Sequence, residues 1–505
     1  MTSTIVIGGG HNGLTAALKL ARSGHSVSIY ERRSHPGGLA APFEFHPGYL
    51  SPGILHDTTT LDRRVVTELG LESFGLEWEK ERHRRIYPVH GDPFTLDLIH
   101  GQHEGLASST SNGLKQFQEW VRTLTPFVQG LYQGAAPNLI DGLNPKQLLS
   151  TGLGALKLGR ATLLELSRMI PQNAEDTLEE FIDSPHVRGA LMLPSLPGTW
   201  MGPLSPSSTA ALVLYWALSG SAVRASGKGL TDALITACKD AGVKLHTDAT
   251  VTAITVKQHR AVGIQLESGE TATADYILST LHPKQTGLNL LPPTSLPYPV
   301  RHALQHIRSR AIATRIHYAV NGPLQWAGTS TTPSEIQVGA HPMTLERAFD
   351  ACKYGHMPTC PVLDIQIPTV RSPQLAPEGH HVVSVLVYGT PTASASLWDD
   401  TGAQEKLNQI VQAQIQKVCP DFSAHIVASE VLTPRGLEHG FGALEGQLFH
   451  GEWSIDQLWS FRPTADLART RSPMPGLILA GSGTQGGGGI RGTAGLLGAK
   501  AALAG

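Results

Sequence analysis

Charge is scarce in this sequence, and neither sign dominates. Lys, Arg, Asp and Glu together make up 16% of the 505 residues, and the formal net charge is -2. A protein that binds nucleic acid neutralises phosphates with a surplus of Lys and Arg, and this chain has no such surplus. We therefore expect no nucleic-acid partner.

Cysteine is scarce as well. The four cysteines lie far apart and form no C-x-x-C pair: Cys238, Cys352, Cys360 and Cys419. A dithiol redox centre or a thiolate metal site requires closely spaced cysteines. We therefore expect buried, reduced thiols, no metal site, and a reducing compartment such as the cytoplasm.

Long hydrophobic runs are missing too. The best candidate, Thr209–Val223, is shorter than the ~20 apolar residues of a membrane-spanning helix and contains Ser219, Gly220 and Ser221. It predicts a core helix of a substrate domain. No signal peptide is expected, because the first apolar residues already form a strand of the predicted nucleotide-binding fold.

A leucine-rich stretch, Asn144–Ile170, leaves three alternatives. Its leucines recur at helical spacing among few charges, most of them basic. The stretch could lie on a membrane surface, form the wall of an apolar pocket or pack in the core. We favour core packing and keep peripheral membrane contact as an alternative.

Glycine, by contrast, is abundant, and its first cluster defines the amino-terminal element. Ile5–Ile7 is typical of a buried parallel strand, and glycines in G-x-G-x-x-G spacing follow it at once: Gly8, Gly10 and Gly13. A helix and a second strand, Ser26–Tyr30, come next and end at Glu31. Such glycines let a pyrophosphate approach the helix N-terminus, and the acid accepts from a ribose hydroxyl. The element therefore predicts dinucleotide binding.

A second glycine pair, Gly37-Gly38, follows soon after Glu31. NAD-binding units do not need it. Flavoproteins of the glutathione-reductase type use such a pair to bring a second loop to the FAD pyrophosphate, and the pattern here resembles theirs. We therefore favour FAD over NAD. Because no second fingerprint with its own strand and acid occurs, we expect no separate NAD(P)H domain.

The carboxyl terminus is expected to close the same unit. Leu477–Ala480 predicts a buried strand, a glycine-dense loop follows, and a small-residue helix begins near Thr493. The N-terminus of that helix could lie at the flavin pyrimidine edge, where its N–H groups would stabilise the reduced ring. Arg491 would add a fixed positive charge there.

Length and pattern predict an α/β fold with two domains. A Rossmann-type FAD-binding domain with glutathione-reductase-like topology would combine residues 1–77, 226–285 and 425–505. An inserted α+β substrate domain would comprise residues 78–225 and 286–424, with a hairpin around Gly91-Asp92 and an antiparallel sheet.

Three motifs together resemble the phytoene-desaturase-related FAD oxidoreductases: GGGHNGL, the Gly37-Gly38 pair and the terminal GSGTQGGGGIRGTAG. The segments Leu432–Pro463 and Leu375–Pro391 resemble more narrowly the branch called pyridine nucleotide-disulfide oxidoreductase domain-containing protein 2. The resemblance implies that the backbone of Val251 lies beside the adenine. The residues that motifs and resemblance together assign to FAD are Gly8, Gly10, His11, Asn12, Gly13, Glu31, Arg32, Gly37, Gly38, Leu39, Val251, Gly481, Ser482, Gly489, Ile490 and Arg491.

The sequence departs from the family at three places near the presumed flavin face. Gln485-Gly486 replaces the usual H-P pair, Arg491 stands where arginine is unusual, and Leu39-Ala40 stands where carotenoid desaturases often carry arginine. These changes argue against carotenoid desaturation itself and leave FAD binding intact. The disulfide in the branch name has no support, because no redox cysteine pair exists.

The predicted function is an FAD-dependent oxidoreductase that dehydrogenates an apolar small molecule by hydride transfer to flavin N5. The electron acceptor stays open among oxygen, a quinone and another protein. Arg491, His56 and Asp57 are the catalytic candidates, although we favour loop hydrogen bonding for His56 and Asp57 and a structural role for His450. The alternatives are amine oxidation, a redox-neutral isomerase as in the carotene isomerases of this family, and a flavin-stabilised interaction protein without turnover.

Overall fold

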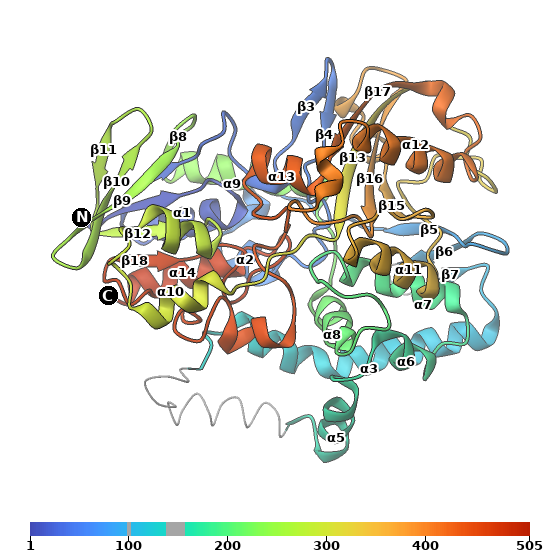
Figure 1. The fold of residues 1–505 in the computed structure, drawn as a ribbon, viewed down its shortest axis with the longest axis horizontal. Helices are drawn as coiled ribbons and strands as arrows, with labels where there is room; N and C mark the ends of the chain where they lie inside the picture. The colour runs from blue at the N-terminus through green and yellow to red at the C-terminus, as the bar shows by residue number, and fades with distance from the viewer. Residues whose placement is uncertain (98–102, 138–156) are drawn as a thin grey trace.

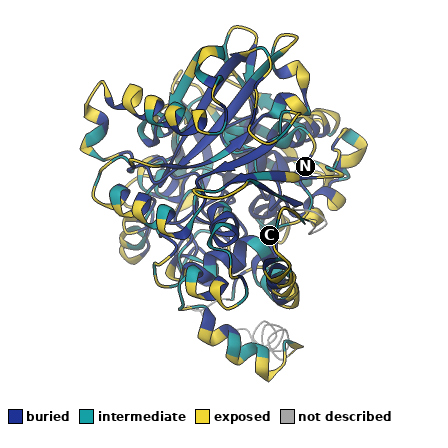
Figure 2. Ribbon diagram, turned by 90° about the vertical axis from the view of Figure 1, so that its right-hand side faces the viewer, coloured by how far each residue is buried: buried dark blue, intermediate teal, exposed yellow. Residues whose placement is uncertain are grey.

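The computed structural model describes residues 1–97, 103–137 and 157–505. Figure 1 shows a smaller sheet in the left half of the molecule and a larger sheet in the right half. The helices α3, α6 and α8 lie along the lower edge of that view. In the side view of Figure 2 the strands in the interior are dark blue, which marks them as buried.

The smaller sheet has five parallel strands in the order β18-β12-β1-β2-β8. Its strands come from both ends and the middle of the sequence: β1 (Ser3–Ile7), β2 (Ser26–Tyr30), β8 (Lys244–His246), β12 (Tyr276–Ser279) and β18 (Leu477–Leu479). Because β12 lies between β1 and β18, the carboxyl-terminal segment is part of the amino-terminal nucleotide-binding unit.

Small residues let the helices of this unit approach closely. Helix α1 (His11–Arg22) contacts α14 (Thr493–Leu503) and α9 (Ser226–Asp240). A Cβ on Gly13 would lie 2.0 Å from the carbonyl oxygen of Gly8, and one on Gly495 would lie 2.1 Å from that of Asn12. Larger residues at these two positions would therefore separate α1 from the turn and from α14.

A three-stranded antiparallel meander lies beside the smaller sheet. It comprises β9 (Val251–Lys257), β10 (Arg260–Leu266) and β11 (Thr271–Thr273). Its apolar residues share one core with residues of β1, β12 and β18. The Ala249 N–H, just before β9, donates to the Glu31 carbonyl at 2.9 Å, which places the start of β9 near the carboxyl end of β2.

The larger sheet has eight strands in the order β17-β13-β16-β15-β14-β5-β6-β7. They are β5 (His83–Tyr87), β6 (Phe94–Asp97), β7 (His103–Glu104), β13 (Ala313–Asn321), β14 (Glu335–Val338), β15 (Val362–Gln366), β16 (His380–Tyr388) and β17 (Ile426–Leu432). Only the β14–β5 pair is parallel. One face packs its apolar residues against α12 (Ala403–Gln416).

The other face of this sheet looks toward most of the remaining helices. The α-helices not yet named are α2 (Arg63–Glu68), α3 (Ser108–Gln133), α5 (Arg160–Met169), α6 (Ala174–Glu179), α7 (Pro185–Met192), α8 (Ser208–Leu218), α10 (Tyr298–Gln305), α11 (Pro342–Lys353) and α13 (Pro434–Phe441). The strands β3 (Phe43–His46) and β4 (Tyr49–Ser51) form a separate hairpin. Residues of α3, α6, α7 and α8 form one large core with residues of β5, β6 and β15.

The α/β class, the amino-terminal unit, the hairpin around Gly91-Asp92 and the core helix α8 are confirmed. The division into two domains stays a prediction. Residue 425 was expected to begin the third piece of the FAD-binding domain, yet β17 pairs with β13 in the larger sheet. Backbone pairing with a distant strand has no signal in the local sequence.

Two further expectations concern the leucine-rich stretch and the cysteines. Residues 144–156 of the leucine-rich stretch lie outside the described residues, and its end forms α5. The expectation of four buried thiols was wrong for Cys360, which is exposed, whereas the other three are buried and all four are free. Within the described ranges no helix is both long and apolar enough to cross a membrane.

Candidate active site

Two glycine loops lie side by side at the N-terminus of α1. Gly10 and Gly37 form an isolated parallel bridge, and a Cβ on Gly38 would lie 3.0 Å from the Cα of Gly10. Gly37 and Gly38 both have positive φ angles, +120° and +60°, which favour glycine. The loops therefore meet without intervening side chains beside the free N–H groups of α1, an arrangement suited to a pyrophosphate.

Glu31 ends β2 beside these loops and is held in place by the backbone. Its Oε2 accepts from the Gly9 N–H at 2.7 Å, and its Oε1 accepts from the Arg33 N–H at 3.0 Å. The residue is only 7% exposed, yet it lines a cavity. Each carboxylate oxygen keeps further acceptor capacity, which a ribose hydroxyl could use.

A cavity of about 290 Å³ runs along these elements. The residues assigned to FAD that line it are Gly8, Gly10, His11, Asn12, Glu31, Arg32, Gly38, Leu39, Val251 and Ser482. Gly13, in the first turn of α1, and Gly37, in the second glycine loop, do not line it, and neither do Gly481, Gly489, Ile490 and Arg491. The cavity thus brings together residues from β1, α1, β2, β9 and the carboxyl-terminal loop.

The sequence did not point to several other lining residues. Phe441, Gly442, Leu448 and His450 all come from the segment after β17. The only sequence signal for this segment was the resemblance of Leu432–Pro463 to the family branch. None of these residues sits in a glycine fingerprint, so pattern alone could not place them at the cavity.

Two histidines that line the cavity, buried His11 and half-buried His450, each have a ring nitrogen without a hydrogen-bond partner among the described residues. The atoms are Nε2 of His11 and Nδ1 of His450. Burial, and then the neighbouring His450, lowers the pKa of His11 to about 4. Burial and the charge of Arg462 lower the pKa of His450 to about 4. Both rings are therefore neutral at pH 7 and can hydrogen-bond a ligand in the cavity, as expected if FAD binds there.

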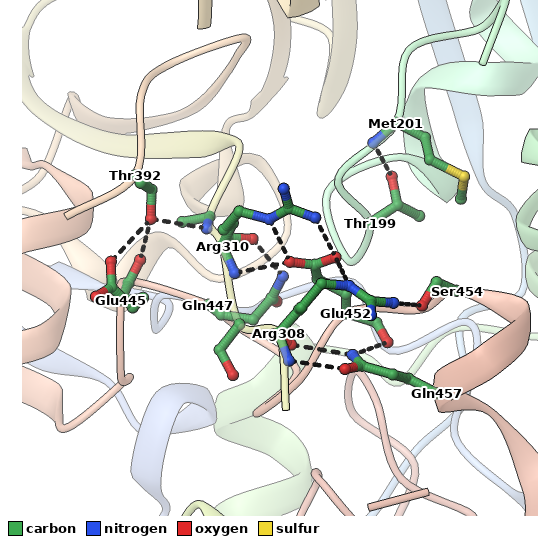
Figure 3. Close-up of polar contacts among 12 residues, drawn as sticks. Thr199, Met201, Arg308, Arg310, Thr392, Glu445, Gln447, Glu452, Ser454 and Gln457 are labelled. Carbon is green, nitrogen blue, oxygen red and sulfur yellow. Dashed lines mark hydrogen bonds and ion pairs between the residues drawn. The ribbon is translucent and has the colours of Figure 1, made fainter. Parts of the chain in front are cut away.

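A polar cluster fixes the segment that carries His450 (Figure 3). The buried carboxylate of Glu452 accepts from the Arg310 Nε at 2.8 Å and forms an ion pair with Arg308 at 3.5 Å. The Gln457 amide donates to the Arg308 carbonyl at 3.0 Å. These contacts join residues 447–457 to the segment just before β13, and so hold Phe449, His450 and Trp453 in place.

The glycine-dense loop before α14 packs tightly against this segment. A Cβ on Gly488 would lie 2.2 Å from Nε1 of Trp453, and one on Gly487 would lie 2.3 Å from the Ser482 carbonyl oxygen. Asn12 of α1 donates to Ser482 Oγ at 3.1 Å. The loop and the first glycine turn are therefore held together.

Arg491 is buried at 1% exposure and does not point into solvent. Its guanidinium lies 4.9 Å from the ring centroid of Tyr132, and its Nε and Nη1 have no hydrogen-bond partner. Burial lowers the pKa of Arg491, while Tyr132 and Asp62 oppose that shift. Arg491 lines neither the 290 Å³ cavity nor the smaller cavity beside it, so its action on the flavin stays a prediction.

A second cavity, of about 60 Å³, adjoins the first. The two share Leu55 and Leu448, and Gly489 of the carboxyl-terminal loop lines the second. Its other lining residues are His56, Asp57, Thr60, Pro194, Pro197, Tyr215, Arg315, Asp364, Gln366, Leu386, Phe449 and Trp453. The segment that carries His56 and the carboxyl-terminal loop at Gly489 therefore meet at this second cavity.

His56 is fully engaged by its neighbours. Its Nδ1 lies 2.7 Å from the Gln366 amide oxygen, and its Nε2 lies 2.9 Å from Ser384 Oγ. Burial, followed by the charge of Arg315, lowers the pKa of His56 well below its usual value. The ring is therefore neutral, with Nδ1–H donating to Gln366, and neither nitrogen is free to take a proton from a substrate.

Asp57 is likewise engaged. It accepts from Tyr215 Oη at 2.6 Å and from Thr59 Oγ1 at 2.6 Å, and it lies 3.5 Å from Arg82. Burial raises its pKa, but Arg82 and these hydrogen bonds outweigh burial, so the net shift is downward. Asp57 therefore stays ionised and fixes Thr59, which agrees with the loop hydrogen bonding favoured from the sequence.

A family model described as flavin containing amine oxidoreductase matches residues 13–502. The chain belongs to this family. It is an FAD-dependent oxidoreductase, as the glycine pattern predicted. The resemblance to phytoene-desaturase-related flavoproteins is also confirmed.

Curated relatives agree with the family. The chain of this flavoenzyme is 28% identical to pyridine nucleotide-disulfide oxidoreductase domain-containing protein 2 of Rattus norvegicus, over 97% of this chain and 91% of that protein. It is 26% identical to 4,4'-diaponeurosporene oxygenase of Staphylococcus aureus strain USA300, over 55% of each chain.

Solved structures agree with the fold. A putrescine oxidase bound to putrescine superimposes with a TM-score of 0.61 at 14% identity, covering 100% of this chain and 98% of the other. At that identity the likeness concerns the fold alone. The flavoenzyme therefore shares its architecture with an amine oxidase, and its substrate has to be argued from its own residues.

Proposed function

We propose that this flavoenzyme is a dehydrogenase of a small molecule, with FAD in the 290 Å³ cavity and the reacting carbon of the substrate in the 60 Å³ cavity. The observation that carries the proposal is the pair of residues common to both cavities, Leu55 and Leu448. A flavin that extends from Glu31 toward the carboxyl-terminal loop would reach this shared wall. Hydride acceptance at N5 is the chemistry that FAD supplies.

The protein's own residues bind and orient. Gly10 and Gly38 leave room for the pyrophosphate, Glu31 accepts from the ribose, and His11 and His450 offer free ring nitrogens. A dehydrogenation to an alkene removes a hydride, which N5 would accept, and a proton, which would finally be released to water, so no side chain with a free proton-accepting atom is required. The full engagement of His56 and Asp57 is compatible with such a reaction.

The walls of the small cavity support a substrate with an apolar body. Apolar side chains form much of the lining: Leu55, Pro194, Pro197, Leu386, Leu448, Phe449 and Trp453. Such a wall excludes water from the reacting carbon, which protects the transferred hydride. The proposal therefore keeps the apolar substrate that the sequence predicts.

Amine oxidation is the second candidate, and the family model favours it by its description. Both reactions would reduce the flavin, but an amine substrate would release ammonia or a smaller amine after hydrolysis. A desaturation would release an alkene and no nitrogen. Analysis of the products from one anaerobic turnover therefore separates the two candidates.

The test of the proposed function is anaerobic reduction of the purified holoenzyme. Candidate substrates are added one by one, and bleaching of the flavin absorbance is recorded. We expect a molecule of the proposed substrate class to bleach the flavin absorbance. The absorbance should recover when the electron acceptor is added, whether oxygen, a quinone or a partner protein. A redox-neutral isomerase would need prior reduction of the flavin, and an interaction protein without turnover would show no bleaching with any candidate.

We also propose that the flavoenzyme works in a reducing compartment and contacts membranes peripherally through α5. Leu164 on this helix is 61% exposed, and Figure 1 shows α5 projecting from the lower edge of the molecule. Arg160 and Arg168 flank it on the same helix. Arg168 is ion-paired with Glu180 at 2.7 Å, so exposed Leu164 and the basic Arg160 are the features that support contact with anionic lipids. Sedimentation with anionic vesicles, lost in Leu164→Asp, tests this contact.

A further inference from the structure

One face of the larger sheet carries a row of polar residues across adjacent strands. The cross-strand register joins, in order, Arg84, Glu335, Gln366, Ser384, His317 and Glu430. Directly paired residues project to the same side of a sheet, so this row faces one way. The opposite face packs apolar residues on α12. Burying a polar row costs free energy, so its groups need partners or a role.

The next row on the same face contains the residues that line the small cavity. Leu386 pairs with Arg315 on one side and with Asp364 on the other. All three line the cavity together with Gln366. The sheet therefore presents one cation and one carboxyl group to the space beside the proposed flavin site.

The carboxylates around this space already have cationic partners. Glu335 forms ion pairs with Arg82 at 2.6 Å, Arg84 at 3.1 Å and Arg371 at 3.3 Å. Asp57 lies 3.5 Å from Arg82, and Asp364 lies 3.9 Å from Arg84. The described carboxylates of this region thus neutralise three other arginines.

Arg315 is the exception. It is 5% exposed, and no described Asp or Glu lies within ion-pair distance of it. Its Nε lacks a hydrogen-bond partner. Burial lowers the pKa of Arg315 to about 10, so the guanidinium stays protonated at pH 7. Burial raises the pKa of Asp364, which weakens the nearest compensating charge. A buried, unpaired cation is costly unless a ligand pairs with it.

We propose that Arg315 binds a carboxylate of the substrate in the small cavity, so that the substrate is a small carboxylic acid with an apolar body. The inference rests on the proposed function, because it assumes that this cavity holds the substrate beside the flavin. A guanidinium offers two parallel N–H donors that match a carboxylate. The apolar side chains shared with the flavin cavity, Leu55 and Leu448, then contact the carbon chain.

The test is titration of the purified holoenzyme with small carboxylates and their matched amides. Acetate and propionate are compared with acetamide and propionamide, and sodium chloride is the control for a general anion. Binding is followed by flavin difference absorbance and by calorimetry. We expect saturable binding of propionate that is roughly tenfold to a hundredfold tighter than binding of propionamide, as for a lost charge-assisted hydrogen bond. Chloride binding as tight as propionate binding would overturn the proposal.

Two variants assign the effect to Arg315. Arg315→Gln should lose the preference for propionate over propionamide, and Arg315→Lys should keep part of it, since a lysine retains the charge without the planar fork. The matched control is Arg371→Gln, which removes a cation from the neighbouring ion network around Glu335 but not from the cavity lining. We expect the control to bind propionate within twofold of the unchanged protein.

The outcomes distinguish the two proposals. Protein that contains no FAD would contradict the proposed function. Protein that contains FAD but binds propionate and propionamide equally, or Arg315→Gln that keeps the preference, would overturn only the role of Arg315. If Arg315→Gln fails to load FAD, the carboxylate–amide comparison in the unchanged protein and in Arg315→Lys decides the question.

Discussion

Gly10 and Gly38 face each other where the two glycine loops meet. Because glycine has no side chain, these positions leave space for a pyrophosphate. A Cβ on Gly10 would lie 3.8 Å from the Cα of Gly38, so a methyl group fits but a branched side chain would fill the gap. Gly10→Val should therefore abolish FAD loading. The measurement is the flavin-to-protein absorbance ratio after purification.

A matched control is available for this substitution. Gly130 lies on the exposed side of α3, and no atom lies within 4 Å of the place where its Cβ would be. Gly130→Val should load FAD like the unchanged protein. Normal FAD content in Gly10→Val would show that the pyrophosphate lies elsewhere.

His11 and His450 make stability depend on pH. Both have a folded-state pKa of about 4, against about 6.5 in an unfolded chain. Between these values the unfolded chain binds more protons, so the free energy of unfolding falls as pH drops from about 6.5 to about 4. Each histidine should lower the free energy of unfolding by about 2 kcal/mol at pH 5 relative to pH 7.

Urea unfolding at pH 7 and pH 5 measures this loss. His450→Gln should reduce the difference between the two pH values by about 2 kcal/mol, because glutamine does not titrate. His356→Gln, at an exposed position, should leave the difference unchanged. The assignment would be wrong if both variants behaved alike.

At the scale of elements, the nucleotide-binding unit requires the carboxyl terminus. Helix α14 contacts α1, and its small residues belong to the same core as β1, α1 and α9. Deletion of residues 480–505 should therefore abolish FAD binding and lower the melting temperature. Deletion of the exposed pair Ala504-Gly505 should change neither. A truncated protein with normal FAD content would contradict this dependence.

Local pattern predicted the strands and helices well where one segment determines its own structure. The β-branched run before Gly8, the turn at Gly91-Asp92 and the apolar helix α8 each carry a local signal. The pairing of β14 with β5 and of β17 with β13 joins segments distant in sequence, and register across such distances depends on the whole core. Local pattern therefore gave no sign that β17, which follows residue 425, would join the larger sheet.

The candidate site divides in the same way. The FAD half could be predicted because the close approach of two loops at Gly10, the positive φ of Gly38 and the carboxylate of Glu31 after β2 each leave a trace in the sequence. The substrate half could not, since Arg315 and Asp364 become neighbours only through their common partner Leu386. His56 and Asp57 were found by residue type, and their hydrogen-bond partners come from β15, β16 and α8.

At the scale of the whole molecule, two sheets bring two cavities together. The smaller sheet and its glycine loops form the nucleotide cavity, and the larger sheet supplies the polar end of the small cavity. Segment 447–457, fixed by Glu452, contributes side chains to both. If FAD lies in the larger cavity as proposed, this arrangement places Arg315 beside it.

The most direct test of this account is a crystal structure of the purified holoenzyme with its own cofactor. We expect the adenine beside Val251, the pyrophosphate between Gly10 and Gly38, and the flavin ring against Leu55, Leu448 and Gly489 with one face toward Arg315. A flavin ring separated from the small cavity would contradict the account, even if the adenine lay as expected.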